Sequence, residues 1–244
     1  MEGTSGISPV IPKFLAVVSI AKNLGITGEI PEVPSIALGT ADLNVYEMVG
    51  AYGTFANQGV YVKPVMVTRI EDKNGTVLYE YVTETKDVLS KDVSYAMLDL
   101  MSGVTQGGSG TRLRTTGAEK YRPEYKEIIT GYPYEFKNPI AGKTGTTQNQ
   151  SDGWFMGMVP NLVTGVWVGG DDKAVHFRTI TYGQGASMAL PIWGLYMKKN
   201  YANKELGISD GEFEKPENLS INVDCSKTST EEDNKIDIED DLDF

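Results

Sequence analysis

Three consecutive segments in the middle of the chain have the length and composition of β-strands. They cover residues 139–146, 153–159 and 162–169, and Pro160-Asn161 provides a tight turn between the second and third. Short runs rich in Val, Thr, Phe and Trp and bounded by turn residues are typical of strands. Strands joined by connections this short pair antiparallel. The sequence therefore predicts an antiparallel meander that helices elsewhere in the chain must cover.

Four stretches are predicted to be helical. Apolar residues recur with the helical period over residues 13–24, before Gly25, and over residues 185–200. Thr40 is the predicted N-cap of a second helix that ends at Gly59, and Ser90 is the predicted N-cap of a third that extends to about residue 104. Pro191 should kink the last helix or mark its true start.

A β-hairpin is predicted between the second and third helices. Its strands are Val65–Ile70 and Thr76–Tyr81, joined through Asn74-Gly75. Residues 106–138 contain several glycines and tyrosines and are expected to be irregular, with the tyrosines as packing anchors. The order of elements predicts an α+β fold, a mainly antiparallel sheet flanked by helices.

Charge and rare residue types narrow the classes of function. The 244 residues carry a net charge of −11, and residues 226–244, with eight acidic residues and two lysines, contribute −6 of it. This balance argues against a nucleic-acid partner and predicts a disordered acidic tail. Cys225 and His176 are the only residues of their types, so we expect no disulfide, no metal site and no cofactor. His176 is predicted to be a surface residue.

The first strand of the meander carries the residues best suited to bind an anion. Lys143, Thr144, Gly145, Thr146 and Thr147 stand in succession. In an extended edge strand, Lys143 and Gly145 share one face and Thr144 and Thr146 the other. The ammonium and hydroxyl groups can hold an anionic ligand, and a bare glycine lets the backbone of that ligand approach closely. The backbone N–H that follows the glycine can point at a developing oxyanion.

The surroundings of this motif resemble a known family. Lys143–Thr147 is followed by Asp152–Gly157, by Thr164–Asp172 and by Gly183–Trp193. This order is similar to the C-terminal half of the transpeptidase domain of penicillin-binding proteins, particularly the bifunctional, class A type. The resemblance extends from about Phe14 to Tyr201. It implies the penicillin-binding-protein and serine β-lactamase-like fold, here incomplete at its N-terminus.

The resemblance also implies an activity and a set of roles. Members of the family cleave the D-Ala-D-Ala end of peptidoglycan stem peptides, transfer the acyl group to an amine, and react with β-lactams. By resemblance, Lys143 is catalytic and binds the substrate carboxylate, and the hydroxyls of Thr144 and Thr146 bind that carboxylate. The N–H of Thr146 would form half of the oxyanion hole, Gly145 would keep the strand bare, and Thr147 is included in the substrate-binding set.

Two further motifs of the family, Ser-x-x-Lys and Ser-x-Asn, are not found in the expected places. Ser19-Ile20-Ala21-Lys22 fits the first in letters, but it lies inside an apolar helix rather than at the start of one. Ser220-Ile221-Asn222 fits the second but follows the Lys-Thr-Gly motif instead of preceding it. We therefore expect no nucleophile in this chain and no acylation of the isolated chain by penicillin.

The resemblance divides the chain into four regions and implies a parent protein. Residues 1–13 do not match, 14–201 are part of a transpeptidase domain, 202–225 form an extension and 226–244 are the tail. The start at Met1 lacks the features of a signal peptide. Full-length members of the family carry an N-terminal membrane anchor, so by resemblance the chain looks truncated. The parent is expected to carry a membrane anchor and a glycosyltransferase domain, and to act on the outer, periplasmic face of the cytoplasmic membrane. The alternatives are a serine β-lactamase or β-lactam sensor and a non-catalytic peptide-binding module.

Overall fold

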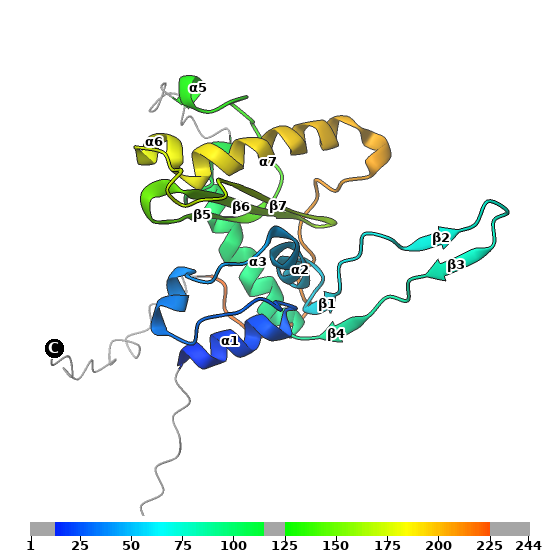
Figure 1. The fold of residues 1–244 in the computed structure, drawn as a ribbon. Coiled ribbons are helices and arrows are strands. Elements are labelled where there is room, and N and C mark those ends of the chain that lie inside the picture. The colour runs from blue at the N-terminus through cyan, green and yellow to red at the C-terminus, as the bar shows by residue number, and fades with distance from the viewer. Residues whose placement is uncertain (1–12, 115–124, 225–244) are drawn as a thin grey trace, which may run out of the picture.

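A small antiparallel sheet lies between layers of helices in this computed structural model, which describes residues 13–114 and 125–224 (Figure 1). The helices are α1 (Lys13–Asn23), α2 (Val45–Ala56), α3 (Lys91–Gln106), α5 (Tyr125–Ile128), α6 (Ile180–Gly183) and α7 (Gly185–Ala202). Short 3-10 helices are η1 (Pro34–Leu38), η2 (Thr111–Leu113), η3 (Gln148–Gln150) and η4 (Lys204–Leu206). The strands are β1 (Val60–Val62), β2 (Arg69–Glu71), β3 (Val77–Glu80), β4 (Thr85–Asp87), β5 (Ala141–Thr146), β6 (Asp152–Val159) and β7 (Leu162–Gly169).

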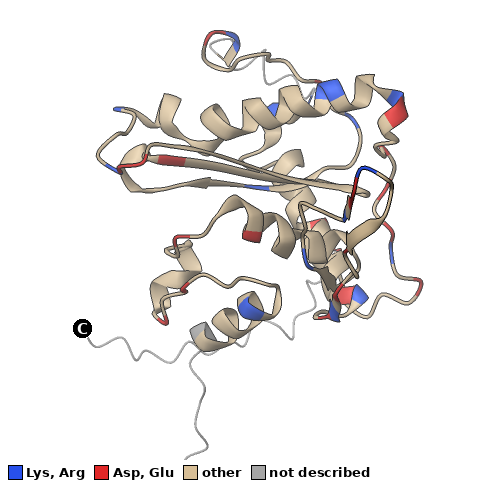
Figure 2. Ribbon diagram, turned by 45° about the vertical axis from the view of Figure 1, so that its right-hand side comes forward, with Lys and Arg blue, Asp and Glu red and all other residues tan. Residues whose placement is uncertain are grey.

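The predicted meander is confirmed as the sheet β5-β6-β7, with both neighbouring pairs antiparallel. β6 is the central strand, and within the described residues β5 pairs with no other strand, so it forms an edge. Lys143 and Asp152 are the charged residues of these three strands, in contrast to the many charged positions along the hairpin and the C-terminal segment (Figure 2). A sheet with so few charged residues can be covered on both faces at low desolvation cost.

Helix α7 covers one face of the sheet. Trp193, Leu190 and Met197 of α7 are almost fully buried against Phe155 and Val159 of β6. The tyrosines that follow the irregular segment join this cluster, as predicted for packing anchors, although Tyr121 lies outside the described residues. The helix begins at Gly185 and contains Pro191, so the proline does not mark its start.

Helices α2 and α3 cover the opposite face, and α1 packs beyond them. Leu98 and Met101 of α3 are buried against Ala141 and Met158 of the sheet. A separate cluster around Val18 joins α1 to α2 through the segment that follows α1. Figure 1 shows the resulting order of layers, from α7 through the sheet and the α2/α3 layer to α1. Helices packed on an antiparallel sheet make this an α+β fold, as predicted.

The prediction for the start of α2 was wrong. The N-cap is Asn44 rather than Thr40, and its side chain accepts a hydrogen bond from the backbone N–H of Glu47. The Asn44 amide donates in turn to the Glu47 carboxylate at 2.8 Å, which gives a reciprocal capping arrangement. Thr40 instead lies in the segment between η1 and α2. Ser90 does cap α3, as predicted, by accepting from Val93 N at 3.2 Å.

The predicted hairpin is present but shorter, and it projects from the body as an arm (Figure 1). β2 and β3 pair around the turn at Gly75, whose φ of 85° suits glycine. The arm is based on a second pair, β1 with β4, which the sequence did not reveal because each strand has only three residues. Among the described residues, no helix has both the length and the apolar character needed to cross a bilayer.

The predicted extension follows α7 and returns along α3. Ser220 N donates to the Asp92 carboxylate at 2.9 Å, and the Gln58 amide donates to Glu214 at 2.6 Å. The acidic tail, Cys225 and nearly all of the predicted N-terminal region lie outside the described residues.

Candidate functional site

The Lys-Thr-Gly motif lies in β5, and the register of the sheet fixes which way its side chains point. Gly145 pairs with Trp154, and Thr144 pairs with Phe155. Phe155 belongs to the core beneath α7, whereas Ala141, two residues before Lys143, packs toward α3. Because side chains alternate along a strand, Lys143 and Gly145 lie on the α3 side and Thr144 and Thr146 on the α7 side. The predicted alternation is confirmed.

The backbone of β5 presents hydrogen-bonding groups at the open edge of the sheet. Thr147 N donates to Asp152 O at 3.2 Å, so the backbone groups of Thr147 face the partner strand β6. In an antiparallel pair, consecutive residues alternate between facing the partner strand and facing away. The N–H and C=O groups of Thr144 and Thr146 therefore point to the edge at which no described strand pairs.

Lys143 is exposed, and its ammonium lies at this edge. Lys143 Nζ donates to the backbone oxygen of Thr144 at 2.7 Å. The amine is thus neither buried nor held by a carboxylate of the described chain. A carbonyl oxygen is a weaker partner than an anion, so a carboxylate that enters the edge can displace it.

Thr144 and Thr146 are each anchored by a hydrogen bond to a segment outside β5. Thr144 Oγ1 lies 2.6 Å from Ser109 Oγ, and Thr146 Oγ1 accepts from Gly185 N at 3.0 Å. A hydroxyl that accepts one hydrogen bond can still donate its own proton. The orientation of Thr146 is therefore set by the first residue of α7, while its O–H remains able to bind an anion.

Ser109 is a residue that the sequence analysis missed. It follows α3 in the run Gly107-Gly108-Ser109-Gly110, where the backbone folds back so that Gly110 N donates to Val104 O at 2.9 Å. Its only local signal was a serine among glycines, and the 35 residues that separate it from Thr144 concealed the contact.

Gly185 allows α7 to approach the sheet closely, and Gly145 leaves room for Trp154 of the neighbouring strand. A Cβ on Gly145 would meet Trp154 Cβ at 3.1 Å, and a Cβ on Gly185 would lie 2.5 Å from Trp154 O and even nearer to Gly145 O. Any side chain at Gly185 would therefore separate α7 from β5 and β6. Because Gly185 N also binds Thr146, this contact positions the site as well as the helix.

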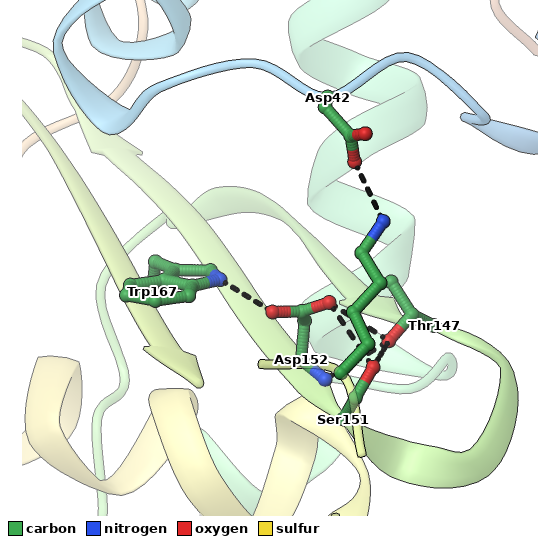
Figure 3. Close-up of polar contacts among 6 residues, drawn as sticks. Asp42, Thr147, Ser151, Asp152 and Trp167 are labelled. Carbon is green, nitrogen blue, oxygen red and sulfur yellow. Dashed lines mark hydrogen bonds and ion pairs between the residues drawn. The ribbon is translucent and has the colours of Figure 1, made fainter. Parts of the chain in front are cut away.

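Thr147 has a different set of contacts, centred on the buried carboxylate of Asp152 (Figure 3). Thr147 Oγ1 lies 3.1 Å from Asp152 Oδ2, and Ser151 Oγ lies 3.2 Å from the same oxygen. Trp167 Nε1 donates to Asp152 Oδ1 at 3.1 Å. Lys173 pairs nearby with Asp42 at 3.0 Å, an interaction that raises the pKa of Lys173. The network fixes the turn between β5 and β6.

The other motif candidates lie elsewhere. Ser19 is on an exposed part of α1, and Lys22 Nζ donates to Gly28 O at 2.6 Å and Thr27 O at 3.4 Å, not to Ser19. Ser220, on the extension, donates its backbone N–H to the carboxylate of Asp92 in α3. His176 is exposed, as predicted. No group of three or more metal-binding side chains gathers among the described residues.

Comparisons with known proteins identify the family and the fold of the chain. The family model "Penicillin binding protein transpeptidase domain" matches residues 32–177. Penicillin-binding protein 1A of Aquifex aeolicus is 33% identical over 213 residues, which are 86% of this chain and 25% of that protein. Penicillin-binding protein 2D of Bacillus subtilis is 33% identical over 74% of this chain and 24% of its own length. The chain thus spans about a quarter of these curated relatives.

Solved structures show the same fold. The crystal structure of penicillin-binding protein 1A from Haemophilus influenzae matches 84% of this chain and 32% of its own, with a TM-score of 0.63 and 23% identity. The PonA1 protein of Mycobacterium tuberculosis, solved in complex with penicillin V, matches 83% of this chain and 53% of its own, with a TM-score of 0.61 and 25% identity. From the matched motif strand, the shared fold and these relatives, we conclude that this chain belongs to the penicillin-binding protein transpeptidase family, of the class A type.

Proposed function

We propose that this chain carries the substrate-carboxylate and oxyanion strand of a peptidoglycan D,D-transpeptidase that cross-links cell walls. The observation that supports this most is the exposed ammonium of Lys143, which lies beside Thr144 and Thr146 on an unpaired sheet edge. Charge, hydroxyl donors and free backbone groups are the components with which a protein binds an extended peptide that ends in a carboxylate.

Each group of β5 then has a defined task. Lys143 exchanges the carbonyl of Thr144 for the carboxylate of the stem peptide or β-lactam, and the hydroxyls of Thr144 and Thr146 donate to the same carboxylate. The edge-facing N–H of Thr146 supplies one donor of the oxyanion hole. Removal of one such donor typically lowers the rate of acyl transfer by about 100- to 1,000-fold. Thr147 contributes indirectly, by holding the turn through Asp152.

The nucleophile of the reaction is proposed to lie outside this chain. Ser109 is at the edge of β5, but its hydrogen-bond partner is the Thr144 hydroxyl, and no described amine, imidazole or carboxylate contacts it as a base. A serine without a base is a poor nucleophile. Lys22, the lysine that follows Ser19 in α1, is already bound to the carbonyls of the next turn. We therefore expect the isolated chain to bind carboxylates without forming an acyl-enzyme.

Intact-mass spectrometry after incubation with penicillin G tests this proposal. The expected result is an unmodified mass. A stoichiometric adduct would contradict it, and peptide mapping would then assign the adduct to Ser19, Ser109 or another residue. Turnover of a chromogenic cephalosporin would instead favour the β-lactamase alternative. Binding of D-Ala-D-Ala peptides by a parent protein that also lacks acylation would favour the non-catalytic module.

The parent protein is proposed to act on the outer face of the cytoplasmic membrane, with a membrane anchor and a glycosyltransferase domain. This follows from the class A relatives, of which the chain spans about a quarter. The coding sequence upstream of Met1 tests the proposal. It should contain a Ser-x-x-Lys and a Ser-x-Asn motif in the same frame, and a stop codon directly upstream would contradict it.

A further inference from the structure

A cavity with charged walls lies beside α3, and no residue of β5 lines it. Its volume is about 620 Å³, and it is lined by α3, Arg114, residues 136–139 and the extension at Glu212-Phe213. A cavity of this size can hold a small organic ligand. None of the roles proposed for the Lys-Thr-Gly strand uses it.

One end of the cavity is basic. Arg114 is only 7% exposed, and its Nη2 donates to Thr105 Oγ1 at 2.7 Å while its Nη1 donates to Asn138 O. Among the described residues no carboxylate contacts this guanidinium, and its Nε has no hydrogen-bond partner. Burial lowers the pKa of Arg114, which is the expected effect of an uncompensated charge. Lys137, exposed on the neighbouring segment, adds a second positive charge.

The other end of the cavity is acidic. Asp99 of α3 and Glu212 of the extension both line it. Burial, and after it the charges of these two carboxylates, raise the pKa of Tyr95, which also lines the cavity. No described residue forms an ion pair with either carboxylate. Four charged side chains therefore line the cavity, two of each sign, separated along α3 rather than paired with one another.

The distance between the basic and the acidic end of the cavity indicates the length of the ligand. Asp99 and Gln106 both line the cavity and are two turns apart on α3, which corresponds to about 10 Å of helix rise. Thr105, the neighbour of Gln106, binds Arg114 and so places the basic end at this level. An extended peptide of about three residues spans a similar length. A phosphate or other polyanion would face the two carboxylates at the acidic end and is disfavoured.

We propose that this cavity binds a zwitterionic peptide of about three residues, with its carboxylate facing Arg114 and Lys137 and its ammonium group facing Asp99 and Glu212. The ligand supplies the charges that neither end of the cavity receives from the described chain. Bound at Asn138, it would contact the segment that leads directly into β5.

Calorimetric titration of the chain with Ala-Ala-Ala tests the proposal. We expect saturable binding, weakened about tenfold or more when the peptide is N-acetylated or C-amidated, because each change removes one charge from a fixed site. The absence of saturable binding at millimolar peptide would overturn the proposal, as would equal affinities for the free and the blocked peptides.

Matched variants locate the bound peptide. Glu212→Gln should weaken binding of the free peptide about tenfold and leave the affinity for the N-acetylated peptide unchanged, since only the ammonium contact is lost. Glu217→Gln, on the same extension but outside the cavity lining, is the control and should bind normally. Because the β5 edge is itself proposed to bind carboxylates, both proteins are also titrated in a Lys143→Ala background, where the effect of Glu212→Gln should persist. Equal binding by the Glu212 variant and wild type, or disappearance of the Glu212 effect in the Lys143→Ala background, would contradict the assignment.

Discussion

Two regions of this chain carry a lysine near hydroxyl residues, and the fold uses them in different ways. In β5, Lys143 is exposed at the open edge of a sheet whose faces are covered by α7 and by α2 and α3. In α1, the Lys22 ammonium is bound to the backbone carbonyls that follow the helix. The first lysine is available to a ligand, whereas the second closes a turn. A short motif can therefore bind a ligand only where the fold leaves its side chains exposed and without a strong partner.

We expect the largest loss of stability from a substitution at the contact between α7 and the sheet. Gly185→Ala should destabilise the chain by about 3 kcal/mol, because its Cβ would overlap backbone atoms of β5 and β6 that cannot move aside. Gly103→Ala in α3 is the matched control. Nothing lies within 4 Å of its Cβ, so it should stabilise the helix by up to about 1 kcal/mol. Urea unfolding of both variants measures the difference. Equal free energies of unfolding would show that α7 does not press on the sheet.

The buried network behind β5 should contribute the next largest effect. Asp152→Ala removes the acceptor of the Trp167 indole N–H and leaves the Thr147 and Ser151 hydroxyls only each other as acceptors. We expect a cost of about 2 kcal/mol. Asp171→Ala, an exposed aspartate in the loop after β7, should change stability by less than about 0.5 kcal/mol. Thermal unfolding of the pair checks this. A harmless Asp152 variant would show that the turn is held by its backbone alone.

Ligand binding should distinguish the two lysines directly. Lys143→Ala should weaken non-covalent binding of penicillin G about tenfold, or about 1.4 kcal/mol, through loss of the charge that meets its carboxylate. Lys22→Ala should bind as wild type does. Quenching of Trp154, which lies across from Gly145, offers a fluorescence readout. If the Lys22 variant lost affinity and the Lys143 variant kept it, the assignment of the two regions would be reversed.

The smallest effect concerns the α1 region. Glu47 accepts hydrogen bonds from Thr27 Oγ1, from Thr27 N and from Gly28 N, and the bond from the Thr27 hydroxyl does most to lower the pKa of Glu47. A lowered folded-state pKa gives stability that is present above 4.5, the unfolded value, and lost as the pH falls through the folded-state pKa. Since the carboxylate is largely solvated, Glu47→Gln should cost less than about 1 kcal/mol at pH 7.

The measurement for Glu47 is the urea midpoint of wild type and Glu47→Gln at pH 7 and at pH 3. The difference between the two proteins should shrink at the lower pH, because the wild-type carboxyl takes up a proton as the pH falls through its folded-state pKa. A difference that stayed constant with pH would mean that Glu47 acts through packing and not through charge.

Local sequence patterns predicted the strands of the sheet correctly. They did not predict the features that depend on contacts between distant residues. The strand positions of β5, β6 and β7 and the Ser90 cap could be predicted because turns and caps depend on adjacent residues. Asn44 displaced Thr40 as the cap of α2 because Glu47 completes a reciprocal pair with it. β1 and β4 were missed because three-residue strands carry too little pattern.

For the candidate site too, some features could be predicted from the local sequence and others could not. The alternation of Lys143 and Gly145 with Thr144 and Thr146 could be predicted from strand geometry alone. The contacts of Ser109 with Thr144 and of Gly185 with Thr146 join residues 35 and 39 positions apart, so no local pattern could indicate them. The cavity beside α3 needs four separate segments, and only the folded chain brings them together.

Lys143 and the open edge of β5 are expected to bind the carboxylate of the ligand. A titration of the isotopically labelled chain with penicillin G, followed by amide chemical shifts, tests it most directly. We predict saturable shifts concentrated at residues 143–147 and near Ser109, which need about tenfold more ligand in Lys143→Ala, with no covalent adduct. Shifts concentrated around Ser19 and Lys22 in α1, or equal shifts in the Lys143 variant, would contradict it.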